Sequence, residues 1–139
     1  MGRQYRIVVV QAVFHKSELE VMLKAAMQQA AEIDLDIVQV RSVPGSMELP
    51  IVAAHALAQP EIDGAVVLGI IEKGETAHGR LMADAVVSNL IGIELSQKKP
   101  IGVGILGPEI MPSQIPPRLE GYAKAAVRAV KNVLEQINP

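Results

Sequence analysis

The sequence has no cysteine, no tryptophan and only three aromatic residues, Phe14 and two tyrosines. The absence of cysteine excludes disulfides, thiolate catalysis, Cys-ligated zinc and iron–sulfur clusters, and it fits the cytoplasmic location that we expect. Half of the residues are hydrophobic, and with so few rings they are mainly Ala, Val, Ile, Leu and Met. Such small or branched side chains suit helices packed closely on a buried sheet.

Excess positive charge and long hydrophobic runs are also missing. Lys and Arg number 13 against 15 Asp and Glu, for a formal net charge of −2, so there is no basic surplus to neutralise a nucleic-acid backbone. The apolar run 65–71 is far shorter than the ~20 residues that span a membrane, and residues 1–10 contain no cleavable secretion signal. We therefore expect no nucleic-acid or membrane partner, and a single domain over residues 1–139.

Hydrophobic patterning indicates strands and helices in alternation. Four segments are expected to be strands. They are the β-branched run 7–10, which is expected to be buried on both faces, the β-rich segment 36–43, the buried run 65–71, and 101–106, which Gly102 and Gly104 weaken. Each precedes a segment with helical spacing: 17–33, 48–58, 76–95 and 118–137. The pattern Ser17-Glu18-Leu19-Glu20 predicts a capping box for the first helix, and 107–117 is expected to be a Pro-rich loop. The sequence thus predicts an α/β fold, a three-layer α/β/α sandwich with a four-stranded parallel sheet.

Ligands of such sheets bind beyond the carboxyl ends of the strands. Gly74-Glu75-Thr76 follows a strand and opens a helix, which suits a phosphate, although a plain capped turn explains it too. Arg118 stands at a helix start, where a cation opposes the helix dipole. This position indicates an anionic ligand, or else an ion pair with Glu109 or Glu120.

Three further residues at this edge are candidates for chemistry. His78 is a candidate acid and base near pH 7. Phe14 can stack on a planar ligand or anchor its loop on the core. Glu48 can bind a polyol or amine, or simply place favourable charge at a helix start. His15 and His55 are interpreted as structural or exposed, and no His, Asp or Glu cluster has metal-ligand spacing, so no metal site is expected.

Two motifs, taken in order, resemble the 6,7-dimethyl-8-ribityllumazine synthase family. They are Pro44-Gly45-Ser46-Met47-Glu48-Leu49-Pro50 and Gly74-Glu75-Thr76-Ala77-His78, and the likeness covers nearly the whole chain. The stretch 104–108 and the compact ending are most similar to the archaeal branch. The resemblance implies a flavodoxin-like fold. It also implies condensation of 5-amino-6-ribitylaminouracil with 3,4-dihydroxy-2-butanone 4-phosphate to the lumazine in riboflavin biosynthesis, with release of phosphate and water and no cofactor.

The resemblance also implies roles for individual residues. His78 matches the proton-transfer histidine. Residues for the pyrimidine and its ribityl chain would be Phe14, Ser46, Met47, Glu48, Ile70, Ile71, Glu72 and Val103. Residues for the phosphate would be Gly74, Glu75, Thr76 and Arg118, the arginine coming from the adjacent subunit.

This chain departs from the family at Glu72, where an aliphatic residue is usual, and at Val103, where many members have a second aromatic residue. Two alternatives stay open. One is an archaeal-type riboflavin synthase, which dismutates two lumazines and needs no phosphate site, so that the Gly-Glu-Thr-x-His motif and Arg118 argue against it. The other is a non-catalytic flavin- or lumazine-binding or shell protein of the same fold.

A chain this apolar is expected to cover part of its surface by self-association. We expect a cyclic homo-oligomer, and the resemblance makes it a pentamer with sites between subunits. Because only five residues precede Arg6, a long N-terminal strand that pairs with a neighbour is not expected. Pentamers or decamers are therefore favoured over the shell of twelve pentamers that some relatives build.

Overall fold

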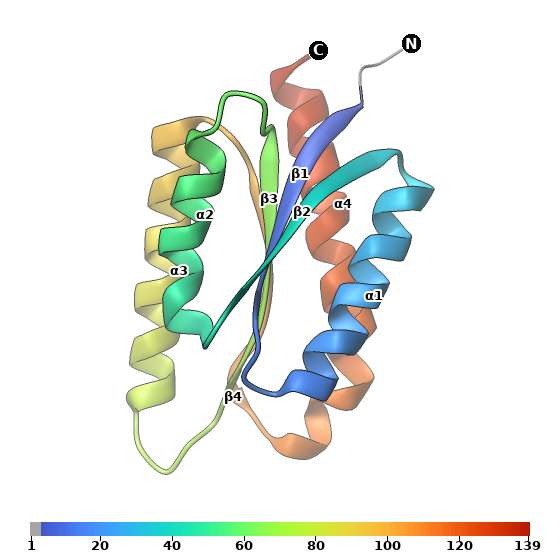
Figure 1. Ribbon diagram of the computed structural model, residues 1–139. Helices are drawn as coiled ribbons and strands as arrows, with labels where there is room; N and C mark the ends of the chain where they lie inside the picture. The colour runs from blue at the N-terminus through green and yellow to red at the C-terminus, as the bar shows by residue number, and fades with distance from the viewer. Residues whose placement is uncertain (1–3) are drawn as a thin grey trace.

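The computed structural model describes residues 4–139 and contains a four-stranded, wholly parallel sheet in the order β2-β1-β3-β4 (Figure 1). The first three residues of the N-terminal segment lie outside this range. The strands are β1 (Tyr5–Ala12), β2 (Leu35–Val43), β3 (Gly64–Glu72) and β4 (Ile101–Ile110). The α-helices are α1 (Lys16–Glu32), α2 (Leu49–Ala58), α3 (His78–Gln97) and α4 (Leu119–Ile137).

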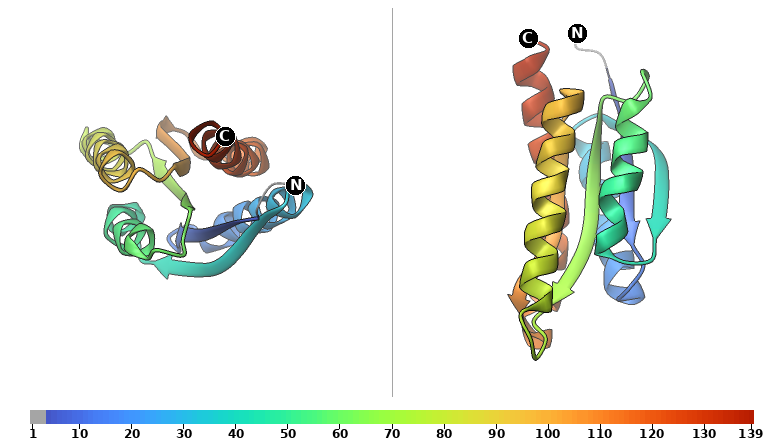
Figure 2. Two further views of the ribbon diagram at one scale, coloured as in Figure 1. Left: turned by 90° about the horizontal axis from the view of Figure 1, so that it is seen from above. Right: turned by 90° about the vertical axis from the view of Figure 1, so that its left-hand side faces the viewer.

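Two pairs of helices sandwich the sheet: α1 and α4 cover one face, and α2 and α3 the other (Figures 1 and 2). Successive residues of the two central strands point to opposite faces, so that Ile7 and Val9 join the core under α1 and α4 while Val8 and Val10 join the core under α2 and α3. Burial on both faces explains why these strands have no polar alternation. The predicted three-layer architecture is confirmed.

Gly102 in β4 shows how closely the layers pack. A Cβ atom at this position would collide with the main-chain carbonyl of Ala126 in α4. The glycines of β4, which weaken a strand by propensity, therefore allow α4 to lie directly on the edge of the sheet.

The carboxyl ends of the strands meet at the edge opposite the two chain termini (Figure 1). Because β1 leads through α1 to β2 on one side and β3 leads through α3 to β4 on the other, the strand order reverses between β1 and β3. This reversal is the place where open parallel sheets bind ligands, and the loops after β1 and β3 both open onto it.

The predicted capping box of the first helix is wrong. Helix α1 begins at Lys16, and its cap residue is His15, in the left-handed region with φ of 68°. The His15 carbonyl already accepts the N–H of Leu19 at 3.0 Å, so helical hydrogen bonding starts ahead of the expected box. Ser17 lies inside the helix and its hydroxyl donates to Glu18 instead.

The segment expected to be an irregular loop over 107–117 is partly regular. Strand β4 continues to Ile110 because Ile110 pairs with Glu72 and its carbonyl accepts the N–H of Lys73 at 3.0 Å. Two 3-10 turns, Pro112–Gln114 and Pro116–Arg118, then lead into α4. Arg118 is thus the residue that caps α4 rather than a member of its first turn.

Candidate functional site

A hollow of about 370 Å³ opens at the carboxyl ends of β1 and β3. We call it the Phe14 hollow. Its lining comes from three segments far apart in the sequence, namely Phe14, Pro44–Glu48 and Ile70–Glu72, together with Met82 of α3. Seven of the predicted site residues, Phe14, Ser46, Met47, Glu48, Ile70, Ile71 and Glu72, are therefore brought together on one concave surface.

Phe14 presents its ring to this hollow rather than to the core. The residue is 68% exposed, so the interpretation as a core anchor is wrong. Its ring meets that of His15 edge to face, with centroids 4.7 Å apart and planes inclined by 75°. Because most of the Phe14 residue is exposed, its ring has surface available for stacking on a planar ligand.

Ser46 and Glu48 line the same hollow from the turn before α2. Ser46 is only 6% exposed, and its buried hydroxyl has no hydrogen-bond partner among the described residues. A Cβ at Gly69 would stand 2.7 Å from that hydroxyl, so a glycine in β3 makes room for it. The Glu48 carboxylate accepts the Gly45 N–H through Oε1 at 2.9 Å, which leaves Oε2 to accept from a ligand.

Glu72, the last residue of β3, has an ionisable partner that the sequence did not indicate. Oε1 of Glu72 lies 3.0 Å from Nε2 of His15. The contact is close but lacks the alignment of a hydrogen bond, since Nε2 has no hydrogen-bond partner among the described residues. The interpretation of His15 as merely structural or exposed misses this pair. The available signal was that Glu72 ends one predicted strand and His15 follows another, both at the carboxyl edge of the sheet.

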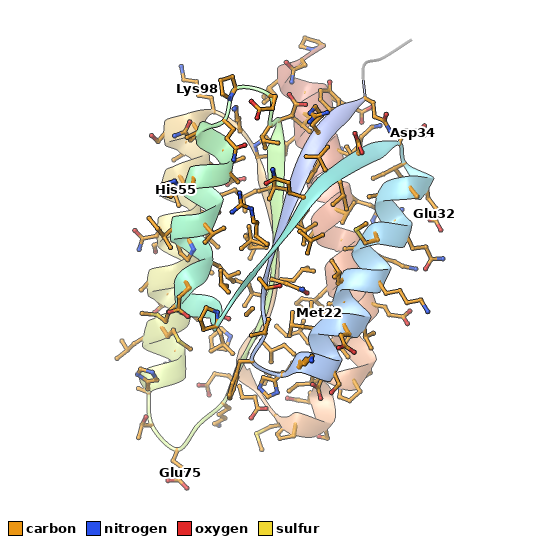
Figure 3. The ribbon with its side chains drawn as sticks, in the orientation of Figure 1. Met22, Glu32, Asp34, His55, Glu75 and Lys98 are labelled. Carbon is orange, nitrogen blue, oxygen red and sulfur yellow. The ribbon has the colours of Figure 1, made fainter. Side chains whose placement is uncertain are left out.

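The residues expected to bind phosphate or move protons follow β3 in the loop before α3. Helix α3 begins at His78, two residues later than expected, and Thr76 Oγ1 accepts the His78 N–H at 3.3 Å. The Thr76 hydroxyl proton remains available to a ligand. His78 is exposed, and Glu75 lies at the tip of the loop with its side chain directed away from the fold (Figure 3). Its carboxylate would repel a phosphate, so that residue offers only its main-chain N–H.

Arg118 lines a second concave region, which consists of two adjoining hollows of about 200 and 520 Å³. We call it the Arg118 region. Arg118 donates from Nη1 to the carbonyl of Gln114 at 2.9 Å, and within residues 4–139 it forms no ion pair with Glu109 or Glu120. Glu109 instead lies 3.5 Å from the Lys73 ammonium. The guanidinium therefore keeps donors for an anion.

The Arg118 region holds one predicted residue and one that was missed. Val103 lies there rather than in the Phe14 hollow, as does Tyr122 of α4. Tyr122 follows Arg118 by four residues, the spacing that places two helical side chains on one face. That spacing was the signal that could have identified it.

The Phe14 hollow and the Arg118 region have no lining residue in common. A larger hollow of about 640 Å³ lies elsewhere, between the carboxyl-terminal ends of α3 and α4. It contains none of the predicted site residues. Within residues 4–139, no three His, Asp or Glu side chains cluster closely enough to hold a metal ion, and none of the described helices is both long and apolar enough to cross a bilayer.

Comparison with known proteins identifies a family whose sequences this chain matches. The model of the family described as 6,7-dimethyl-8-ribityllumazine synthase matches residues 4–138. Three similar proteins all carry that name. The one from Staphylothermus marinus is 35% identical over 94% of this chain and 87% of its own length. The one from Pyrobaculum arsenaticum is 33% identical over 89% and 83%, and the one from Saccharolobus islandicus is 29% identical over 97% and 88%.

Proposed function

The chain belongs to the 6,7-dimethyl-8-ribityllumazine synthase family, and on this premise we propose how its residues carry out the family's reaction. The amino group of 5-amino-6-ribitylaminouracil attacks the ketone of 3,4-dihydroxy-2-butanone 4-phosphate, and water leaves to form an imine. Elimination of phosphate leaves an enol, which tautomerises to a ketone. The ribitylamino nitrogen then attacks this new carbonyl, and the ring closes with loss of a second water. The protein must orient the two substrates toward each other, bind a phosphate dianion and move protons.

The Phe14 hollow is the site for the pyrimidine substrate. The exposed face of the Phe14 ring stacks on the heterocycle, while Ile70 and Ile71 lie along its edge. Ser46 and Glu48 supply a hydroxyl and a carboxylate oxygen for the ribityl hydroxyls. The unpartnered hydroxyl of Ser46 supports this assignment, because a buried polar group needs a partner.

The amino-terminal end of α3 and Arg118 together bind the phosphate. The main-chain N–H groups of Gly74 and Glu75, the Thr76 hydroxyl and the helix dipole all favour an anion. Arg118 adds a permanently charged guanidinium whose planar donors match phosphate oxygens.

His78 moves protons between the amine, the carbinolamine and the departing groups. Its imidazole stands on the first residue of α3, directly beyond the turn that binds phosphate. A proton donor there reaches the bonds that break next to the phosphate. General acid–base groups of this kind contribute ~10²–10⁴-fold to rate.

The complete site is formed between two copies of the chain. We take from the family that Arg118 of one copy serves the Phe14 hollow of its neighbour. Within one copy the hollow and the Arg118 region share no lining residue. A head-to-tail ring repeats this contact around a closed cycle. We take the pentamer from the family.

The assembly of the Phe14 hollow from residues 14, 44–48 and 70–72 is the observation that carries the proposal. The test is to mix the purified protein with the two substrates and to follow lumazine fluorescence and inorganic phosphate together. Equal amounts of both products are expected, with no riboflavin formed from lumazine alone. Riboflavin formed without phosphate would indicate the riboflavin synthase reaction, and binding without any product would indicate a non-catalytic protein.

A further inference from the structure

Glu72 and His15 form a close pair at the Phe14 hollow. Glu72 lines the hollow, and its side chain is 36% exposed. The His15 side chain is 19% exposed, contacts Glu72 and is absent from the lining of the hollow. One member of the pair therefore faces the ligand, and the other faces the first member.

The backbone holds His15 in place. His15 adopts a left-handed conformation with φ of 68°, which few non-glycine residues adopt, and its carbonyl accepts the first hydrogen bond of α1. Its ring is also held against that of Phe14. The main chain that carries the imidazole is thus held, and the ring itself contacts Phe14. An imidazole placed in this way can limit the rotamers of the Glu72 carboxylate.

A carboxylate in this position selects one kind of ligand edge. An ionised carboxylate only accepts hydrogen bonds, so it favours N–H groups and disfavours carbonyl oxygens. The other carboxylate of the hollow, Glu48, is already bonded to its own loop and is assigned to the ribityl chain. Of the ring-facing residues, Ile70 and Ile71 have apolar side chains, which leaves Glu72 as the charged acceptor for the heterocycle.

Resting on the function proposed above, we propose that Glu72 accepts a hydrogen bond from a ring N–H of the pyrimidinedione that stacks on Phe14. His15 is a positioning residue that acts through Glu72. The pair makes the hollow specific for heterocycles with an N–H donor at that edge, a selectivity that an aliphatic residue at position 72 does not provide.

The experiment measures binding of a 6-ribitylaminouracil without the reactive 5-amino group, by calorimetry, so that no turnover is required. Glu72→Ile is expected to weaken binding by about 10- to 100-fold, the effect of losing a hydrogen bond to a charged group. Glu72→Gln, which keeps an acceptor oxygen, should bind with intermediate affinity. Glu61→Gln removes an exposed carboxylate at the opposite edge of the sheet and is the matched control, with affinity unchanged.

A double-mutant cycle separates positioning from a purely structural role. Asparagine tolerates the left-handed conformation but is too short to reach Glu72, so His15→Asn is expected to weaken binding severalfold. In the Glu72→Ile background the same change should have no further effect, because His15 acts only through Glu72. In assays of turnover, both variants should raise KM for the pyrimidine and leave KM for the phosphorylated substrate unchanged.

The failure of this inference is distinguishable from failure of the proposed function. A wild-type protein that makes lumazine, while Glu72→Ile binds the uracil as tightly as wild type, overturns the role of Glu72 alone. Additive effects of His15→Asn and Glu72→Ile overturn the role of His15. A wild-type protein that neither binds the uracil nor makes lumazine overturns the proposed function and this inference together.

Discussion

We propose that individual side chains at the carboxyl edge of the sheet divide the reaction between them. Phe14 supplies a ring face, Ser46 a buried hydroxyl and Arg118 a cation without a carboxylate partner within residues 4–139. None of these three features stabilises the fold. The Phe14 ring is left in solvent, the Ser46 hydroxyl is unpaired among the described residues, and the Arg118 cation opposes a helix dipole. We propose that the substrates supply the missing partner of each residue: a planar ring for Phe14, a hydrogen-bonding group for Ser46 and a phosphate for Arg118.

At this scale His78→Ala is expected to lower kcat by ~10²–10³-fold without abolishing turnover, because imine chemistry proceeds slowly without an acid–base group. Steady-state assays with both substrates saturating measure the change, and circular dichroism should show an intact fold. His55→Ala, which removes an exposed imidazole from α2, serves as the control and should leave kcat unchanged. Full activity of the His78 variant would exclude its role in proton transfer.

Arg118→Ala is expected to raise KM for the four-carbon phosphate by about 10- to 100-fold, as charge-assisted hydrogen bonds to phosphate are lost. Binding of the pyrimidine should scarcely change. Inorganic phosphate should compete with the phosphorylated substrate in the wild type and much less in the variant. If phosphate does not compete in the wild type, the anion site lies elsewhere.

Whole elements differ in how far the sequence predicted them. All four strands and helices were predicted, because a β-branched run without polar residues and an Ala-rich stretch at helical spacing each act locally. The end of β4 was not, since Ile110 joins the strand through its pairing with Glu72, a contact between segments nearly forty residues apart. The start of α1 was also missed, because His15 caps it in a left-handed conformation and accepts the Leu19 N–H, an arrangement that no capping motif in the sequence indicates.

The candidate site shows the same difference between local sequence patterns and contacts between distant segments. Phe14, Ser46 and Glu48 were predicted because their motifs are contiguous in the sequence. The partnership of His15 with Glu72 depends on β1 and β3 lying side by side, and the grouping of Val103 with Arg118 depends on α4 packing against β4. Neither arrangement produces a contiguous motif in the sequence, so neither could be predicted from it.

The packing of α4 on β4 leads to a prediction about stability. Gly102→Ala should lower the free energy of unfolding by about 1–3 kcal/mol, because the new Cβ collides with the main chain at Ala126. Gly121→Ala, at an exposed position in α4 with no atom within 4 Å of the added Cβ, should be neutral or slightly stabilising. Urea denaturation measures both, and equal effects of the two substitutions would contradict the close approach of α4.

The molecule as a whole leaves much apolar surface uncovered. Helices α2 and α3 expose Ile51, Leu81 and Leu95 at 60%, 67% and 73%, and α2 contains no Asp, Glu, Lys or Arg. Large apolar patches of this kind often mark interfaces, and we propose that a second copy of the chain covers this one, as the family's pentamer implies.

Light scattering at micromolar concentration is expected to give the mass of a pentamer or a decamer. The prediction follows from the uncovered helices and from the division of the site between the Phe14 hollow and the Arg118 region. A mass near sixty chains would contradict only the expectation that pentamers stay separate. A monomer that retains full activity would contradict the shared site.

The most direct test of the account is complementation between two impaired variants. Rings assembled from equal amounts of His78→Ala and Arg118→Ala contain sites in which one neighbour supplies an intact His78 and the other an intact Arg118. If each site is formed by two adjacent copies, about a quarter of the sites are wild type in both respects. With the phosphorylated substrate held well below its wild-type KM, where both variants are slow, the mixed rings should form lumazine at about that fraction of wild-type activity. Mixed rings no more active than the average of the two variants assayed separately would contradict a site shared between copies.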